Sequence, residues 1–243
     1  MTTTTEHNGR LGNQIIRNLA VSLIAEKFNL QVNYSNKHLI NTLGIELFNG
    51  SNNHNYTIQL NDANYFSIYN SNSLNYNLYP NDHFFQTKEI IEVLYTHLNT
   101  YKIKNNIINT NSYKDRYSQN NDLFIHIRLT DATKYNPGIN YYLNTINNIR
   151  FDNLYIATDD KTHEFISIIL AKYPNATILE YDEIHTIQFG STCKNIILSH
   201  GSFSAVIGYI AFYSNIYYPE YEADKMWHGD MFSIDNWIKC RVI

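Results

Sequence analysis

Strand-like and helix-like segments alternate through the second half of this 243-residue chain, and this alternation limits the possible folds more than any other feature. Runs of aliphatic and β-branched residues predict strands at 123–128, 154–158, 177–180, 195–199 and 216–218. Apolar residues at helical spacing predict helices between them, at 139–149, 161–173, 184–193 and 203–214. Such alternation predicts an α/β fold with a parallel sheet and crossover helices. Ligands of these sheets bind at the carboxyl ends of the strands.

The first half of the chain is less regular. Apolar residues at helical spacing predict a helix over 14–28, with Asn13 as its N-cap. A strand at 30–34 and a helix at 88–98 are also predicted, whereas 49–81 reads as loops with marginal strands. The polar and charged stretch 105–121 is the best candidate for a domain boundary. We therefore expect two domains, residues 1–115 and 116–243, with a final helix that can pack back on the first.

Composition and charge exclude some classes of partner. The formal net charge is −4, and the 18 Lys and Arg residues form no run, so the chain offers no basic surface for a nucleic acid. The longest uninterrupted apolar part, 205–213, is too short to cross a bilayer core of about 30 Å. Residues 1–10 are polar and do not resemble a secretory signal. Cys193 and Cys240 are expected to be buried thiols, and the protein to be soluble and cytoplasmic.

A glycine-containing segment precedes the first predicted helix. Gly9 and Gly12 lie three residues apart, and Asn13 follows them. Free backbone N–H groups and the helix dipole at such a place favour a phosphate. The structural alternative is an ordinary turn followed by a helix cap.

Polar residues also follow the predicted strands of the second half. His126 and Arg128 alternate with Ile127, so they share one face, and a guanidinium there suits a diphosphate. Arg128 paired with a carboxylate such as Asp131 is the structural alternative. Thr158, Asp159 and Asp160 end the next strand without the D-x-D spacing of many metal-dependent glycosyltransferases, and helix capping is their alternative role. Ser202 opens a late helix, as a cap or as part of a phosphate site.

Taken together, these motifs resemble the α-1,2-fucosyltransferases of glycosyltransferase family 11 in order and spacing, and protein O-fucosyltransferases more distantly. The resemblance runs through 193–197 to Pro219 and 235–238, and covers most of the chain except 49–81. It implies a two-domain GT-B fold, with two Rossmann-like halves and the donor site in the C-terminal half. It also implies an inverting transfer of a deoxyhexose, L-fucose from GDP-fucose, to a glycan hydroxyl. No metal and no cofactor other than the nucleotide-sugar donor are implied.

The resemblance also implies roles for single residues. The phosphate-binding arginine of the family falls on Arg128 and its donor-contacting histidine on His126. The residues that fall in the donor-binding group are Gly12, Asn13, Asp159, Ser202 and Phe203.

Three departures from the family bear on the donor. Leu129, Thr130 and Asp131 stand where a second arginine and a glycine-aspartate are usual, and Ala205 and Val206 stand where tryptophan is usual. Thr186 falls on the acidic position that reads guanine. One hydroxyl cannot accept both of the hydrogen bonds that guanine N1 and N2 donate. Asp182 or Glu183 can take over after a small loop shift; otherwise the donor is another nucleotide sugar, such as a UDP-deoxysugar.

The expected reaction is direct displacement at the anomeric carbon by an acceptor hydroxyl. Charge develops on the leaving diphosphate, so Arg128, the 12–13 backbone and the helix start at Ser202 are expected to stabilise it. Asp131 and His126 are the candidates for a general base, and domain closure is expected to exclude water. The alternative of a different class is a catalytically inactive nucleotide- or sugar-binding protein.

Overall fold

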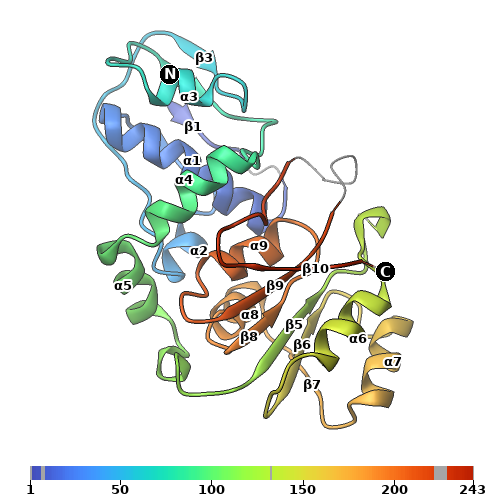
Figure 1. Ribbon diagram of the computed structural model, residues 1–243. Helices are drawn as coiled ribbons and strands as arrows, with labels where there is room; N and C mark the ends of the chain where they lie inside the picture. The colour runs from blue at the N-terminus through green and yellow to red at the C-terminus, as the bar shows by residue number, and fades with distance from the viewer. Residues whose placement is uncertain (1, 7–8, 132, 222–228, 243) are drawn as a thin grey trace.

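A six-stranded parallel sheet forms the centre of the second half of the chain (Figure 1). The computed structural model describes residues 2–6, 9–131, 133–221 and 229–242. The strand order is β10-β9-β8-β5-β6-β7, and every neighbouring pair is parallel. The strands are β5 (Leu123–Ile127), β6 (Leu154–Thr158), β7 (Thr177–Ile178), β8 (Asn195–Ile197), β9 (Asn215–Pro219) and β10 (Ile238–Cys240). The predicted α/β fold with a parallel sheet is therefore confirmed, and its topology is compatible with a Rossmann-like fold.

The strand order reverses beside β5. The chain runs outward from β5 to β6 and β7, then returns to place β8 on the other side of β5. Such a reversal opens a crevice at the carboxyl ends of the two central strands, where ligands of doubly wound sheets bind. The sheet therefore predicts a binding site beyond Ile127 and Ile197.

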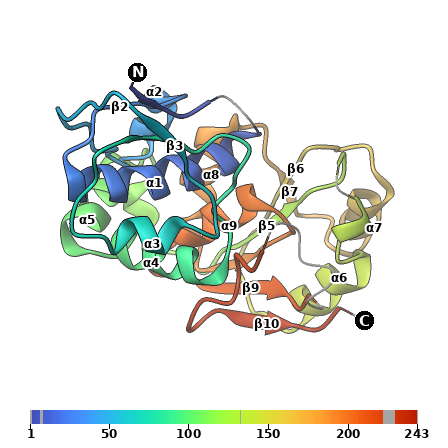
Figure 2. The same cartoon turned by 90° about the horizontal axis from the view of Figure 1, so that it is seen from above.

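Helices cover both faces of the sheet. The crossover helices are α6 (Ile139–Asn147), α7 (Glu164–Lys172), α8 (Glu183–Gly190) and α9 (Ser202–Tyr209). Along β5, Leu123, Ile125 and Ile127 pack with α6 and α7, whereas Phe124 packs in the core on the other side, together with residues of α8, α9 and α1. This alternation turns His126 toward the α8–α9 face. Figure 2 shows α6 and α7 on the side of the sheet away from α1.

The N-terminal part is built around one long buried helix, α1 (Leu11–Phe28). This part also contains two short pairs of parallel strands. β1 (Thr3–Thr4) pairs with β2 (Val32–Asn33), and β3 (Thr57–Gln59) pairs with β4 (Asn77–Tyr79). Leu78 N donates to Thr3 Oγ1 at 2.9 Å, which joins the two pairs. The remaining helices are α2 (Lys37–Thr42), α3 (Tyr65–Tyr69), α4 (Lys88–Leu98) and α5 (Tyr101–Thr110). A GT-B arrangement of two Rossmann-like halves stays a prediction.

Two local predictions were wrong. The N-cap of α1 is Arg10 and not Asn13, because Gly9 turns the chain earlier with a φ of 81°. Asn13 lies inside the first turn and bonds with side chains of other segments instead. The last described segment forms β10 where a final helix was expected, although Trp237 beside it does contact Tyr95 of α4, with ring centroids 6.2 Å apart.

The stretch expected to be a domain boundary packs against residues of the second half of the chain. Its first residues belong to α5, and Lys114–Arg116 forms a short 3-10 helix. Asn111 Nδ2 donates a hydrogen bond to Gln188 O at 3.0 Å. Arg116 forms an ion pair with Asp122 at 2.7 Å, and its guanidinium carbon lies 4.3 Å from the ring centroid of Phe189.

None of the helices in the described ranges has both the length and the apolar character needed to cross a membrane.

The two halves approach each other closely where α1 meets the start of α9. A Cβ added at Gly12 would lie 2.5 Å from the backbone nitrogen of Phe203 and 2.6 Å from the carbonyl carbon of Ser202. Figure 1 shows α9 between α1 and the sheet. Around this contact, apolar residues of both halves form one continuous core.

We predict that Gly12→Ala lowers the free energy of unfolding by about 3 kcal/mol, because the new methyl group meets backbone atoms that cannot rotate away. Glu26→Ala, on the exposed side of the same helix, is the control and should change stability by no more than about 0.5 kcal/mol. Chemical denaturation of both variants measures the difference. Equal stability of Gly12→Ala and the unaltered protein would contradict the close backbone contact.

Candidate functional site

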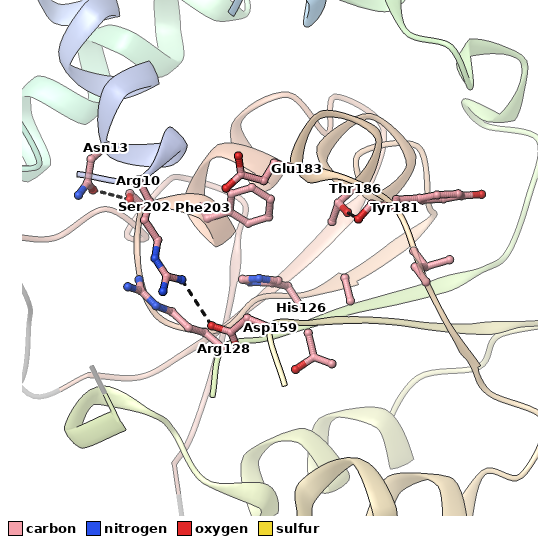
Figure 3. A pocket seen from close by; sticks show the side chains of 13 residues that line it. Arg10, Asn13, His126, Arg128, Asp159, Tyr181, Glu183, Thr186, Ser202 and Phe203 are labelled. Carbon is pink, nitrogen blue, oxygen red and sulfur yellow. Dashed lines mark hydrogen bonds and ion pairs between the residues drawn. The ribbon is translucent and has the colours of Figure 1, made fainter. Parts of the chain in front are cut away.

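A pocket lies at the carboxyl end of the sheet, between the start of α1, the ends of β5 and β6, and helices α8 and α9 (Figure 3). It has about 820 Å³ of empty space, open solvent at its mouth included. Its lining residues are Arg10, Asn13, His126, Arg128, Ala157, Thr158, Asp159, Leu179, Tyr181, Glu183, Thr186, Ser202 and Phe203. One end is charged and polar, and the other is mostly apolar and aromatic.

Two arginines from opposite halves of the chain meet at the charged end. Arg128 grips Asp131 with two hydrogen bonds, from Nε at 2.6 Å and from Nη2 at 2.8 Å. Arg10 Nη2 lies 3.3 Å from the same Asp131 Oδ2. Both guanidinium groups therefore converge on one anionic oxygen, and Arg128 lowers the pKa of Asp131 below its usual value. The ion pair considered as the structural alternative for Arg128 does form, but it forms at the edge of a pocket.

Asp159 holds the loop that follows β5. Its Oδ1 accepts from Leu129 N at 2.7 Å, its Oδ2 accepts from Thr130 Oγ1 at 2.6 Å, and Arg10 Nη1 lies 3.5 Å from Oδ2. Burial alone would raise the pKa of Asp159, but the hydrogen bonds from Thr130 and Leu129 bring it below its usual value. The capping role considered for this aspartate pair is not observed, since His163 caps α7.

The start of α9 lies against both arginine-bearing segments. Its N-cap is Gly201, with a φ of 90°, and a Cβ there would lie 2.3 Å from Arg128 Nη1. Only glycine allows both this backbone conformation and the close guanidinium. Asn13 Oδ1 accepts hydrogen bonds from Gln86 Nε2 at 2.9 Å and from Ser202 Oγ. Both bonds occupy the oxygen of the Asn13 amide, which leaves Nδ2 as its donor.

His126 is buried beneath this charged end. Its Nδ1 lies 2.5 Å from Ser204 Oγ, and its ring centroid lies 5.1 Å from that of Phe203. The pKa of His126 is lowered to about 3, mainly by burial; the charge of Asp159 acts in the opposite direction, whereas His200 and Arg128 contribute to the lowering. A group with so low a pKa is a poor general base at neutral pH. Of the two candidates for a general base, Asp131 and His126, the low pKa therefore argues against His126.

A second buried histidine, His200, lies close to Arg128. Burial and the charge of Arg128 lower the pKa of His200 to about 4, while the carbonyl and carboxylate of Asp131 act in the opposite direction. Its Nδ1 lies 3.3 Å from Ser199 Oγ. His200 was not predicted from the sequence as a site residue, although it precedes Ser202 by only two positions.

The apolar end contains one carboxylate. Leu179, Tyr181 and Phe203 line it together with Glu183 and Thr186 of α8. Asp182, the other carboxylate considered from sequence, caps α8 by accepting from His185 N at 2.7 Å and does not line the pocket. Thr186 Oγ1 donates to Tyr181 O over 3.5 Å. Of the two carboxylates considered from sequence, Glu183 is therefore the one that lines the pocket.

Most of the candidate residues from sequence lie together. Seven line the pocket, namely Asn13, His126, Arg128, Asp159, Thr186, Ser202 and Phe203. Gly12 lies behind it, where it allows the close contact with α9, and Asp131 lies beside it as the partner of Arg128. Arg10 was not predicted from the sequence as a site residue. The available signal was a basic residue directly before a helix that was already a candidate for binding a phosphate.

Within the described ranges, no three His, Cys, Asp or Glu side chains are grouped so that they could hold a metal ion. No protein-family model matches this chain, and no curated protein matches its sequence. The family resemblance therefore depends on short motifs, and a functional proposal depends on the geometry and chemistry of the pocket.

We predict that acid destabilises the protein in the pH range where free histidine titrates. Because the pKa values of His126 and His200 in the folded state are about 3 and about 4, the unfolded chain binds protons below pH 6.5 that the folded chain excludes. The free energy of unfolding should fall as the pH drops, by about 2 kcal/mol per histidine between pH 7.5 and pH 5.

Denaturant unfolding at the two pH values measures this loss. His200→Gln should remove about half of it, whereas His38→Gln, at an exposed histidine, is the control and should leave it unchanged. A loss of the same size in His200→Gln and in the unaltered protein would contradict the shifted pKa of His200.

Proposed function

We propose that this protein is a nucleotide-sugar-dependent glycosyltransferase that binds the donor diphosphate between Arg10 and Arg128. The observation that carries the proposal is the convergence of two guanidinium groups, from opposite halves of the chain, at the N-terminus of α9. This convergence lies at the reversal of strand order, where doubly wound folds bind nucleotides. A diphosphate needs such a concentration of hydrogen-bond donors.

The charged end can stabilise a leaving group. Asp131 supplies the anionic oxygen that both arginines contact, and a phosphate oxygen can take that place with more negative charge. The backbone N–H groups at the start of α9 and the helix dipole add to the same field. Because these groups are held by the fold, they would stabilise charge on the diphosphate as the glycosidic bond breaks. An acceptor hydroxyl would attack the opposite face of the sugar and invert the anomeric centre.

The apolar end can hold a nucleobase. Tyr181, Leu179 and Phe203 offer flat or aliphatic surface to a ring, and Glu183 offers two acceptor oxygens to its edge. Guanine donates from N1 and N2 and matches a carboxylate, whereas uracil has one such donor. This chemistry supports GDP-linked donors, and with the motif resemblance it supports L-fucose transfer to a glycan hydroxyl on a GT-B scaffold without a metal.

A second candidate function is nucleotide or sugar binding without catalysis. The observation that favours it is the occupied guanidinium of Arg128, which already makes a bidentate pair with Asp131. A transferase must release this pair or recruit the diphosphate beside it. Slow hydrolysis of the donor to the nucleoside diphosphate distinguishes the two functions, since a pure binding protein leaves the donor intact.

We predict that Arg128→Ala lowers donor turnover about a hundredfold, because the loss of a charge-assisted contact to the leaving group costs about 3 kcal/mol. Arg128→Lys should recover part of the rate, since lysine keeps the charge without the bidentate grip. Arg10→Ala should have a smaller effect, about tenfold, because the Arg10 side chain is 55% exposed.

Release of nucleoside diphosphate from a panel of GDP- and UDP-sugars, in buffer with EDTA, measures turnover. Lys88→Ala is the control, because it removes a cation of α4 that does not line the pocket. Unchanged turnover in a folded Arg128→Ala protein would restrict Arg128 to a structural role. The absence of turnover with every donor, together with tight nucleotide binding, would favour the binding protein.

We predict that GDP binds at least tenfold more tightly than UDP and that Glu183→Gln removes this preference. Hydrogen bonds from guanine to a charged acceptor contribute about 1.5–3 kcal/mol to binding. Asp182→Asn is the matched control, since asparagine also caps helices and position 182 lies outside the pocket lining. Calorimetric titration of both nucleotides into each protein tests this. Equal affinities for GDP and UDP in the unaltered protein would favour Thr186 as the residue at the base and a UDP-linked donor.

A further inference from the structure

A chain of buried hydrogen bonds lies behind His126. The backbone N–H of Ser199 donates to Ser204 Oγ at 2.9 Å, and Ser204 Oγ lies 2.5 Å from His126 Nδ1. Ser204 is fully buried, and His126 is 7% exposed. The chain of hydrogen bonds joins the segment after β8, the first turn of α9 and the end of β5, and both α9 and β5 contribute residues to the charged end of the pocket.

The Ser199 bond decides where the Ser204 proton goes. Ser204 Oγ already accepts from Ser199, and its own hydroxyl proton needs an acceptor. Within the described part of the chain, His126 Nδ1 is the remaining hydrogen-bond partner of this oxygen. If Nδ1 carried a proton, it would donate to Ser204 and leave a buried hydroxyl proton without an acceptor, which costs about 1–3 kcal/mol. Ser204 therefore donates and Nδ1 accepts.

The imidazole is then protonated on its other nitrogen. A neutral histidine carries one proton, so a Nδ1 that accepts leaves the proton on Nε2. The ring lines the pocket while Nδ1 is held by Ser204, so Nε2 is the nitrogen available to a ligand. The charged groups that act on the ring are Asp159, Arg128 and His200, and burial outweighs the attraction of Asp159 for a second proton.

We propose that Ser204 is a positioning residue that holds His126 as the Nε2–H tautomer, so that His126 presents a neutral N–H donor to an anionic oxygen of a bound nucleoside diphosphate. The identity of the ligand rests on the proposed function, but the tautomer does not. The opposite tautomer would present a lone pair to the phosphate and repel it. With Nε2 protonated, His126 has no free site from which to accept the proton of an acceptor hydroxyl.

The first test needs no ligand. Long-range proton–nitrogen correlation spectra of the ¹⁵N-labelled protein at pH 7 distinguish a protonated from an unprotonated ring nitrogen, and the missing signals of His126→Gln assign them. The expected result is a protonated Nε2 and an unprotonated Nδ1. A protonated Nδ1, alone or together with Nε2, would overturn the proposal.

The second test compares serine variants. Ser204→Ala should allow a detectable fraction of the Nδ1–H tautomer and weaken GDP binding about tenfold, whereas Ser204→Thr keeps a hydroxyl and should restore both. Ser191→Ala is the matched control, because Ser191 is also a fully buried, hydrogen-bonded serine, but its hydrogen-bond partners Asn111, Tyr117 and Gln188 do not line the pocket. Thermal unfolding checks each variant, and Ser204→Cys, with a weaker donor, replaces Ser204→Ala if the latter does not fold.

The outcomes separate this inference from the proposed function. An unchanged tautomer and unchanged GDP affinity in Ser204→Ala would show that Ser204 does not position His126. If neither GDP nor UDP binds the unaltered protein, the proposed function and the phosphate contact both fail. The nitrogen spectra then still decide whether Ser204 sets the tautomer.

Discussion

The site depends on one backbone contact, the packing of the first turn of α1 on the start of α9. Gly12 has no Cβ, so the helix can approach the peptide between Ser202 and Phe203 to a distance that any other residue would prevent. This contact carries Arg10 and Asn13 from the N-terminal half to the carboxyl edge of the sheet. The pocket between the halves therefore has a rigid side, formed by two helix starts that touch.

Charge balance is the second constraint on the site. Two arginines that converge without an anion would repel each other in a partly buried place, and Asp131 and Asp159 compensate for them. The second cation of the site, Arg10, comes from a distant segment. The family that the motifs resemble usually has its second arginine directly after the first, where this chain has Leu129. On the proposed function, a diphosphate would compete with Asp131 for the same donors.

Sequence patterns predicted the strands of the sheet accurately, but they predicted the roles of single residues less accurately. Buried strands and amphipathic helices have distinct periods, so the segments 123–128 and 154–158 predicted β5 and β6 to within a residue. The N-cap at Arg10 was not predicted, because the left-handed backbone of Gly9 makes the helix start earlier. Many different sequences can form such a turn, so no residue pattern identifies it. Glu183 was weighed equally with Asp182, because only the direction of α8 separates a carboxylate that lines the pocket from one that caps the helix.

The sequence by itself determined the parallel α/β core and the residues at the ends of its strands, because hydrophobic period and strand–helix alternation are local properties. Only the tertiary structure decided which of those residues meet. It placed Arg10 on the same carboxylate oxygen as Arg128, and it buried Ser204 where its hydroxyl can set the tautomer of His126. These contacts join residues separated by 118 and 78 positions, and no local pattern encodes them. They follow from the reversal of strand order and from the helix packing that a glycine permits.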